Sequence, residues 1–479
     1  MSFTAPQSVD VVIVGAGLSG LRAATELHKH GLSYVVLEAM DRVGGKTLTM
    51  PASSQGGVVD VGAAWINDTT QAEMYRLGKQ FGFELVEQWA TGLNLFQNSD
   101  KETVSFPYGS MPFPIREAFI KLASIIERSN LDEPWSGPDA VRLDSLNCQE
   151  LVEKEVGGEL GGILLNMLSR SLLGVESDEM SALFLIDYIK SGTGLENISS
   201  DCKHGAQYLR NRQGKFLRLD LREPNIGLSL PKFIGNQTYS IRLAESLILG
   251  SVKLSSPVKK ISQSDSVCKV ETVSGKIFNC KKVLLSVPST LYPVIDFQPD
   301  LPHTKKVLSE SKLGYYSKTI LVYKEPWWRH AGLSGSISTT DGPVVFSRDT
   351  CVPDDRQYSI TCFHVGEPGR RWSKLPTQEE RQAEVLSQFN AVFSTIVDNV
   401  PEPINIIEKE WTKDEWAMGA PNPVMVQGVI TSDAGKAIRE PFGNIHFIGT
   451  ETSIVWKGYM EGAVLSGIRG AQEVIAILG

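Results

Sequence analysis

The chain has 479 residues and a formal net charge of −8; 42% of its residues are hydrophobic and 21% are charged. This length predicts two domains, and the composition is typical of a folded globular protein, which excludes a disordered chain. The negative charge argues against broad nucleic-acid binding and against adhesion to an anionic membrane.

No targeting signal is expected from the residues at the two ends of this sequence. A first strand is expected near Val9, which leaves too little sequence for a secretory signal peptide. Residues 461–478 have apolar residues at helical spacing, but Arg469 and Glu473 interrupt them, so a spanning helix is not expected. Six cysteines without CxxC pairs indicate a reducing compartment and no metal site. We expect a cytoplasmic protein without a membrane anchor. The sequence leaves open whether it forms a homodimer.

The first predicted element is an apolar strand that leads directly into a glycine-rich turn, VVIVGAGLSG at residues 11–20. An unbroken apolar run predicts a parallel strand whose sheet has helices on both faces. Gly15 permits a tight turn, Gly17 lets a pyrophosphate approach, and Gly20 lets the following helix pack closely. The next apolar run ends in Glu38, at the distance expected for an acid that binds an adenosine ribose. The pattern predicts a dinucleotide site.

The remaining elements follow in a mixed order. A helical region is predicted from about 110 to 204, and strands are predicted between 252 and 286. More strands follow at 319–323 and 358–363, then a helical stretch at 379–399, and a last apolar strand at 444–448 that ends in a second glycine turn. Phosphate-loop features at both ends imply one nucleotide domain assembled from distant segments. We predict an α/β fold with a discontinuous dinucleotide-binding domain (1–84, 233–307 and 414–479) interleaved with an α+β substrate domain (85–232 and 308–413).

Several motifs occur in order along nearly the whole chain. They are VVIVGAGLSG, EAMDRVGGK, VVDVGAAW, LLGVESDEMSAL, GAQ, VLLSVP, LGYYSKTILVYKEPWWR and GTETSIVWKGYMEGAVLSG. Together they resemble the flavin-dependent monoamine oxidase family. The resemblance implies a glutathione-reductase-like, two-dinucleotide-binding (Rossmann-type) FAD domain and a monoamine-oxidase-like substrate domain.

The resemblance also implies which residues contact FAD. Gly15, Gly17 and Gly20 would hold the pyrophosphate, Glu38 the adenosine ribose, and Glu451 the ribityl hydroxyls. Further residues would line the rest of the cofactor: Arg42, Gly44, Gly45 and Lys46 at the diphosphate and ribityl chain, Val258 at the adenine, and Trp65, Trp411, Trp456, Tyr459 and Met460 around the isoalloxazine. The family usually has arginine where this chain has Lys46, so that contact loses the bidentate fork.

Lys318 lies in the pattern LG-x-x-x-K, where the family places a lysine beside flavin N5. Burial there would depress its pKa and make it useful in oxygen chemistry. We therefore predict Lys318, Tyr459 and Trp411 as catalytic residues. The wall of the substrate cavity is expected to include Gln207, Leu172, Leu173, Pro421 and Tyr459.

Other interpretations of these residues stay open from the sequence. A lysine that begins an apolar strand is ordinarily a snorkelling surface residue. Trp411 and Trp456 could be core aromatics, the glycines near Gly44 could only shape a turn, and Asp60 could be a solvated acid at a strand end.

Two positions depart from the family pattern. Ala420 stands where mammalian monoamine oxidases carry the cysteine that is thioether-linked to flavin, so FAD should be noncovalent. Pro421 stands where the family often has one of two tyrosines that flank the amine, while Tyr459 keeps the other. The cavity near the flavin is therefore expected to be wider.

An apparent insertion of roughly twenty residues follows Gln207 and carries five basic residues. One interpretation is a solvated surface hairpin. The other is a basic rim at the mouth of the active site that attracts carboxylates on a large substrate; some fungal relatives oxidise fumonisin-type amino-polyols that carry such groups. The basic residues are Arg210, Arg212, Lys215, Arg218 and Arg222.

The implied reaction oxidises an amine, a primary and long-chain or bulky one, to an imine. Hydrolysis then gives an aldehyde or ketone plus ammonia, and O2 is reduced to H2O2. An L-amino-acid oxidase or a polyamine oxidase on the same fold is the alternative, and a lysine-demethylase role is disfavoured because no long helical insertion is present. Two alternatives to an amine oxidase belong to other functional classes: an NAD-dependent dehydrogenase and a flavin-binding protein without turnover.

Overall fold

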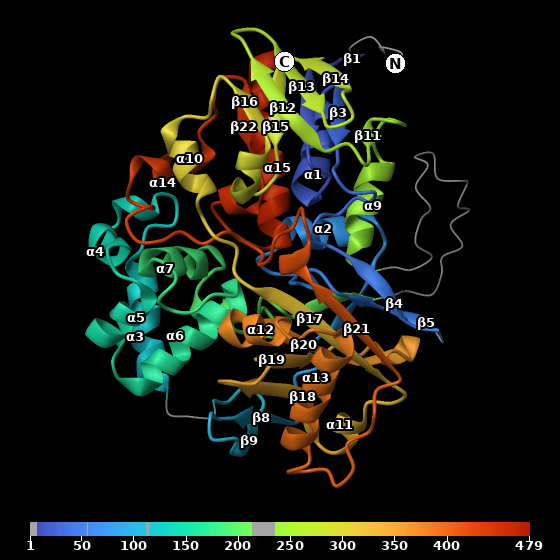
Figure 1. The fold of residues 1–479 in the computed structure, drawn as a ribbon, viewed down its shortest axis with the longest axis vertical. Coiled ribbons are helices and arrows are strands. Elements are labelled where there is room, and N and C mark those ends of the chain that lie inside the picture. Colours follow the sequence, from blue (N-terminus) through green and yellow to red (C-terminus); the bar gives the residue numbers. More distant parts are fainter. Residues whose placement is uncertain (1–6, 55, 112–114, 213–234) are drawn as a thin grey trace.

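The computed structural model describes residues 7–54, 56–111, 115–212 and 235–479 (Figure 1). Its first sheet is entirely parallel, and its strands come from three distant parts of the chain. The glycine motif follows the strand β2 in the middle of this sheet. In spatial order the strands are β11 (Val252–Lys253), β3 (Tyr34–Leu37), β2 (Val11–Val14), β15 (Lys282–Leu285) and β22 (Ile445–Phe447).

Helices cover one face of this parallel sheet. Val11 and Ile13 point into a core that also contains Leu21 of α1 (Leu18–Lys29) and Val464 of α15 (Met460–Leu478). The two helices approach closely, because a Cβ added at Gly467 would lie 2.3 Å from the carbonyl oxygen of Ser19. Two further helices, α2 (Ala72–Gln80) and α9 (Gln237–Glu245), complete this side.

A second sheet covers the other face, so the prediction of helices on both faces is wrong for that face. Val12 and Val14 pack against Ile261 and Val270 in one core. The apolar run requires only that both faces be covered, and an apolar sheet meets that requirement as well as helices do. The strands of this second sheet are β1 (Gln7–Ser8), β14 (Ile277–Cys280), β13 (Cys268–Thr272), β12 (Val258–Gln263) and β16 (Asp296–Gln298).

A seven-stranded mixed sheet lies at the opposite end of the molecule in Figure 1. Its central strand pairs are antiparallel, and β17 and β20 are each eight residues long. In spatial order the strands are β21 (Asn405–Glu410), β17 (Tyr316–Tyr323), β20 (Tyr358–Val365), β19 (Phe346–Asp349), β18 (Leu333–Thr339), β8 (Leu93–Gln97) and β9 (Thr103–Pro107).

The helical region predicted near 110–204 is present as a separate group of helices, at the left of Figure 1. These helices share one hydrophobic core, which includes Leu122 and Ile189 and consists mostly of aliphatic side chains. The helices are α3 (Arg116–Arg128), α4 (Ala140–Asp144), α5 (Cys148–Leu151), α6 (Gly158–Leu173), α7 (Ala182–Ser191) and α8 (Leu195–Ile198).

The remaining elements link these parts or cover them, and all but one are short. They are the strands β4 (Thr49–Ser53), β5 (Gly56–Asp60), β6 (Trp65–Ile66), β7 (Glu84–Glu87) and β10 (Leu209–Arg212), and the helices α10 (His303–Ser309), α11 (Trp327–His330), α12 (Gly366–Ser373), α13 (Gln378–Phe393) and α14 (Asp433–Lys436). In the described ranges, no helix is long and apolar enough to cross a bilayer. The predicted domain boundaries stay a prediction.

Candidate active site

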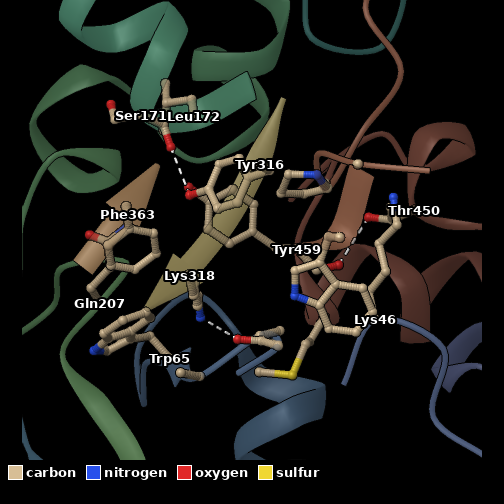
Figure 2. Close-up of a pocket in the computed structure, with 18 of the residues that line it drawn as sticks. Lys46, Trp65, Ser171, Leu172, Gln207, Tyr316, Lys318, Phe363, Thr450 and Tyr459 are labelled. Atoms are coloured by element: carbon tan, nitrogen blue, oxygen red, sulfur yellow. Dashed lines mark hydrogen bonds between the residues drawn. The ribbon is translucent and has the colours of Figure 1, made fainter. Parts of the chain in front are cut away.

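A cavity of about 900 Å³ extends from the parallel sheet to the seven-stranded sheet. At one end it is lined by residues at the carboxyl ends of parallel strands, including Val14, Leu37, Ser286 and Gly449. Crevices at this edge of a parallel sheet are where α/β folds bind nucleotides. Figure 2 shows part of the cavity, with Lys46, Lys318 of the seven-stranded sheet and Tyr459 of the C-terminal segment among the residues that line it.

The glycine loop forms the first wall. Gly15 has a φ of +101°, which favours glycine, and a Cβ added at Gly20 would lie 2.0 Å from the Gly15 carbonyl oxygen. Gly20 therefore sets the close packing of α1 on the loop and does not line the cavity. Gly15 and Gly17 do line it, and a Cβ added at Gly17 would meet no described atom within 4 Å.

Glu38 lies beside this loop, where the sequence predicts it. Its carboxylate accepts hydrogen bonds from the backbone N–H of Ala16 (2.6 Å) and of Met40 (2.9 Å), and it lines the cavity together with Val258. Burial raises its pKa, and the hydrogen bonds from Met40 and Ala16 and the charge of Arg42 oppose the shift. Glu38 ties the end of β3 to the glycine loop.

A second glycine loop follows. Gly44, with a φ of +116°, and Gly45 line the cavity, but the Arg42 side chain does not. Its guanidinium instead donates to the carbonyl oxygens of Gly45 (2.8 Å) and Thr47 (3.1 Å). Arg42 therefore braces the loop that carries Gly44 and Gly45, and its contact with a diphosphate stays a prediction.

Lys46 and Glu451 bring two opposite charges to the middle of the cavity. The Lys46 ammonium donates to the carbonyl oxygen of Ala420, and Glu451 accepts from the backbone N–H (2.7 Å) and the hydroxyl (3.1 Å) of Ser289. Burial lowers the pKa of Lys46 to about 8, against the opposing charges of Glu451 and Asp414. Burial also raises the pKa of Glu451.

Lys318 lies at the far end, on β17, and its side chain points into the cavity (Figure 2). It is 4% exposed, so it is not a snorkelling surface residue. Its ammonium donates to the carbonyl oxygen of Gly62 and lies over the rings of Phe363 (5.0 Å) and Trp65 (5.4 Å). Burial lowers its pKa to about 8, although the charge of Asp60 favours the ammonium.

The predicted aromatic residues divide into two sets. Trp65, Trp411, Tyr459 and Met460 line the cavity. Trp456 does not: its indole N–H donates to the carbonyl oxygen of Thr70 (2.8 Å), and its ring packs edge-on against Tyr459 at 5.0 Å. It is a core aromatic that supports Tyr459. The indole N–H of Trp411 donates to Val61 (2.8 Å), which orients this ring at the wall.

Four of the five residues expected at the substrate wall line the cavity: Leu172, Gln207, Pro421 and Tyr459. Leu173 is fully buried in the helical core instead. The face of α6 that lines the cavity carries Met167, Leu168, Ser171 and Leu172. Leu173 lies a further ~100° around the helix and points into the helical core. Gln207 donates to the Ile198 carbonyl oxygen (3.3 Å), and its own Oε1 is buried without a partner in the described chain.

Asp60 is not a solvated acid. Its carboxylate accepts from the Thr49 hydroxyl (2.6 Å) and from the backbone N–H of Asn236 (3.0 Å). Burial raises its pKa to about 6, while these hydrogen bonds and the charge of Lys318 oppose the shift. Asp60 is thus a buried charge that acts on Lys318.

The basic-rim interpretation is wrong for its first two residues. Arg210 is buried and donates to the carbonyl oxygens of Thr350 (3.0 Å) and Cys351 (2.8 Å), and Arg212 is paired with Asp355 (3.2 Å). Both fasten β10 to the neighbouring loop and lie outside the large cavity. A buried arginine is stable there because carbonyl oxygens satisfy its donors. The other three, Lys215, Arg218 and Arg222, lie outside the described residues.

Sequence reasoning missed several cavity residues. Tyr316 and Phe363 lie beside Lys318, and the Tyr316 hydroxyl donates to the Ser171 carbonyl oxygen (3.0 Å; Figure 2). Phe363 pairs directly with Lys318 across β17 and β20. Alternation along β20 indicates a two-sided strand, but the strand register that brings Phe363 to Lys318 is not readable from the sequence. The other missed residues include Tyr108, Tyr188, Asp201, Phe346 and Arg348.

Comparison with protein families gives one match, over residues 18–475, to a family described as flavin containing amine oxidoreductase. Among curated relatives, amine oxidase [flavin-containing] B of Sus scrofa is 30% identical over 487 residues, covering 98% of this chain and 86% of the relative. The amine oxidase [flavin-containing] B of Homo sapiens is 29% identical over 489 residues with the same coverage.

Two solved structures share the fold over 98% of this chain. Putrescine oxidase bound to putrescine superposes with a TM-score of 0.86 at 27% identity and is covered completely. Cyclohexylamine oxidase from Brevibacterium oxydans IH-35A superposes with a TM-score of 0.86 at 27% identity over 99% of its length. The likeness therefore includes both the parallel sheet and the seven-stranded sheet.

Proposed function

The chain belongs to the flavin-containing amine oxidase family, whose members oxidise amines with FAD, and on this premise we propose that it acts on a primary amine with a long or bulky tail. The products are an imine, hydrolysed to an aldehyde or ketone plus ammonia, and H2O2 from O2. The observation that carries the proposal is the position of a buried lysine, Lys318, among aromatic rings at the far end of a nucleotide-sized cavity.

The residues of the cavity fit FAD. A Cβ at Gly17 would occupy open space in the cavity, and a pyrophosphate needs this space to approach the backbone. Gly17 also lies at the N-terminus of α1, where backbone N–H groups favour a phosphate. Glu38 is placed to accept hydrogen bonds from the adenosine ribose, with Val258 at the adenine. Glu451 is placed to bind the ribityl hydroxyls and Lys46 to contact the middle of the cofactor. When bound, FAD takes up a hydride equivalent from the carbon that bears the amine and returns it to O2.

We further propose that FAD is held without a covalent bond. Ala420 offers no sulfur for a thioether, and its carbonyl oxygen accepts the hydrogen bond from Lys46. The cofactor should therefore pass through an ultrafiltration membrane after the protein is denatured. Retention of the yellow chromophore on the denatured chain would contradict this proposal.

The substrate must enter as the neutral base, although an alkylamine has a pKa of ~10 in water. Tyr459, Tyr316 and Phe363 provide a largely apolar, aromatic environment, and such an environment disfavours the ammonium form. The Tyr459 ring packs in a tilted arrangement against Tyr188, with the centroids 6.2 Å apart, and edge-on against Trp456. These contacts fix the ring where it can face the amine nitrogen. Pro421 leaves room beside it for a bulky carbon.

Lys318 acts on the oxygen side of the reaction. Its ammonium is fixed by the Gly62 carbonyl oxygen and is placed to stabilise the negative charge that develops on O2 as it takes up electrons. Asp60 assists by favouring the charged form of this lysine. No carboxylate is needed to accept a proton from the amine.

A peroxide-release screen tests the proposal. The panel runs from benzylamine through long aliphatic amines to amino-polyols, with putrescine and L-amino acids as the rival substrates. We expect peroxide from primary amines with long or bulky tails. If only L-amino acids were oxidised, the proposed function would be wrong.

A further inference from the structure

A second polar cluster lies in the same cavity, away from Lys318, and consists of Asp201, Arg348 and Tyr108. Asp201 follows α8, Arg348 is on β19, and Tyr108 follows β9; all three line the cavity. Arg348 and Tyr108 both donate hydrogen bonds to the same oxygen, Oδ2 of Asp201. Three separate segments of the chain therefore converge on one carboxylate.

The other oxygen of this carboxylate is unused. Asp201 is only 7% exposed, and its Oδ1 is buried with no hydrogen-bond partner in residues 7–54, 56–111, 115–212 and 235–479. A buried charged oxygen without a donor is costly, so native proteins rarely retain one unless a ligand or water supplies the donor. The unused oxygen belongs to a residue of the cavity wall.

Sheet pairing places the cluster relative to the reaction centre. Lys318 and Phe346 both pair with Phe363, so the three lie in one row across β17, β20 and β19. Arg348 is two residues along β19 from Phe346 and thus on the same face. With strands 4.8 Å apart and a rise of 3.4 Å per residue, the α-carbons of Lys318 and Arg348 are about 12 Å apart. A substrate tail can span this distance along the cavity.

The charges of the cluster decide which chemical group fits. The cluster places one positive and one negative charge side by side, so a substrate ammonium at Asp201 would lie close to the Arg348 guanidinium, and a substrate carboxylate at Arg348 would lie close to the Asp201 carboxylate. A hydroxyl is neutral and can donate to the unused oxygen. Ser336, Ser338 and Asn94 add further polar groups to the same wall.

We propose that Asp201, held by Arg348 and Tyr108, is a specificity residue that binds a hydroxyl group on the tail of the amine substrate. This inference rests on the proposed amine oxidation. It predicts that the enzyme selects amino alcohols over plain alkylamines, diamines and amino acids of the same length.

The test compares kcat/KM for four series of matched chain length: n-alkylamines, α,ω-amino alcohols, α,ω-diamines and ω-amino carboxylates. The ratio of the kcat/KM values for two substrates, measured on one preparation, does not depend on the fraction of active protein. We expect one amino alcohol to exceed its matched alkylamine by about tenfold, the effect of a hydrogen bond to a charged group. Asp201→Asn should remove most of that preference, measured as the ratio of kcat/KM for the amino alcohol to kcat/KM for its matched alkylamine.

Two further variants keep the test decisive. Asp355→Asn is a matched control, since Asp355 also pairs with an arginine and also has a buried unpartnered oxygen, but lies outside the large cavity. It should keep the wild-type preference. Asp201→Glu retains the charge opposite Arg348 and moves it farther into the cavity, so the preferred amino alcohol should become shorter.

The failures are distinguishable. If no amine in any series released peroxide, the proposed function itself would be wrong. If alkylamines were oxidised as well as amino alcohols, or if diamines or amino carboxylates were preferred, only the hydroxyl subsite would be overturned. The same holds if Asp355→Asn changed the preference as much as Asp201→Asn did.

Discussion

At the scale of single residues, Lys318 has the most unusual environment in the cavity. It is a cation between two aromatic rings, with one hydrogen bond to a carbonyl oxygen and a buried carboxylate, Asp60, acting on it. The motif predicted the residue and its burial, whereas the ring of Phe363 became visible only in the folded chain.

Replacing Lys318 with methionine should slow reoxidation of reduced flavin by O2 by more than tenfold, because the charge that stabilises reduced oxygen is lost. FAD content should be unchanged. Burial lowers the pKa of Lys318 to about 8, so the side chain is charged below that pH and neutral above it. Stopped-flow reoxidation in the wild type should therefore slow as pH rises through about 8.

The Lys318→Met variant should show no such inflection. Equal reoxidation rates in the two proteins would remove Lys318 from the mechanism. Persistence of the inflection in the variant would assign it to another group, and Lys46, whose pKa is also lowered to about 8, would be the first candidate.

Lys46 has a different role in this account, which is to retain the cofactor. Lys46→Met should raise the Kd for FAD by about tenfold, since a hydrogen bond from a charged donor is lost. Fluorescence titration of the apoprotein measures it. Lys46→Arg, which restores the side chain usual in the family, is the control and should bind FAD at least as tightly as the wild type. A methionine variant with unchanged affinity would contradict the role.

At the scale of elements, the glycine loop separates packing from binding. Gly20 permits α1 to contact the carbonyl oxygen of Gly15, while Gly17 faces open space in the cavity. The same motif therefore contains one residue that the packing of α1 requires and one that we propose for the cofactor.

Alanine substitutions should separate these roles. Gly20→Ala should destabilise the apoprotein by about 1–3 kcal/mol through overpacking, as seen in its thermal unfolding. Gly17→Ala should leave the unfolding of the apoprotein nearly unchanged but prevent tight FAD binding. The assignment would fail if the two variants had the same effect on both measurements.

The strands of the seven-stranded sheet show what sequence patterns cannot supply. The apolar runs at 319–323 and 358–363 predicted β17 and β20 correctly, and both strands extend a little further at their ends. A pattern of period two does not specify which residues face each other, so the pairing of Lys318 with Phe363 had to come from the structure. The same limit applies to Asp201 and Arg348, which have no motif.

At the scale of the molecule, the parallel sheet was predictable because the glycine motif and the late strand that ends in Gly449 both carry local signals. The second sheet, which covers the other face, was not predictable, because a sheet and a helix bury an apolar strand equally well. Residues expected to touch FAD or substrate but found in the core, such as Trp456 and Leu173, share the apolar character of true cavity residues. Sequence alone does not separate the two classes.

Bound FAD should raise the free energy of unfolding of the chain, because the residues proposed to hold it come from distant segments. A ligand that binds only the folded state stabilises it by about 2.7 kcal/mol at a concentration of 100 times its Kd. Adding FAD to the apoprotein should therefore raise the midpoint of thermal unfolding by several degrees, while AMP at equal concentration should raise it less. Equal effects of the two ligands would indicate that the far end of the cavity does not hold the flavin.

The central claim is that a primary amine reduces FAD bound in this cavity. Anaerobic titration of the yellow holoenzyme with a long-chain primary amine tests it directly. We predict bleaching of the flavin absorbance to completion, followed on admission of O2 by recovery of the absorbance and release of peroxide equal to the flavin. A spectrum that stays oxidised with every primary amine, in a protein that contains FAD, would contradict the account.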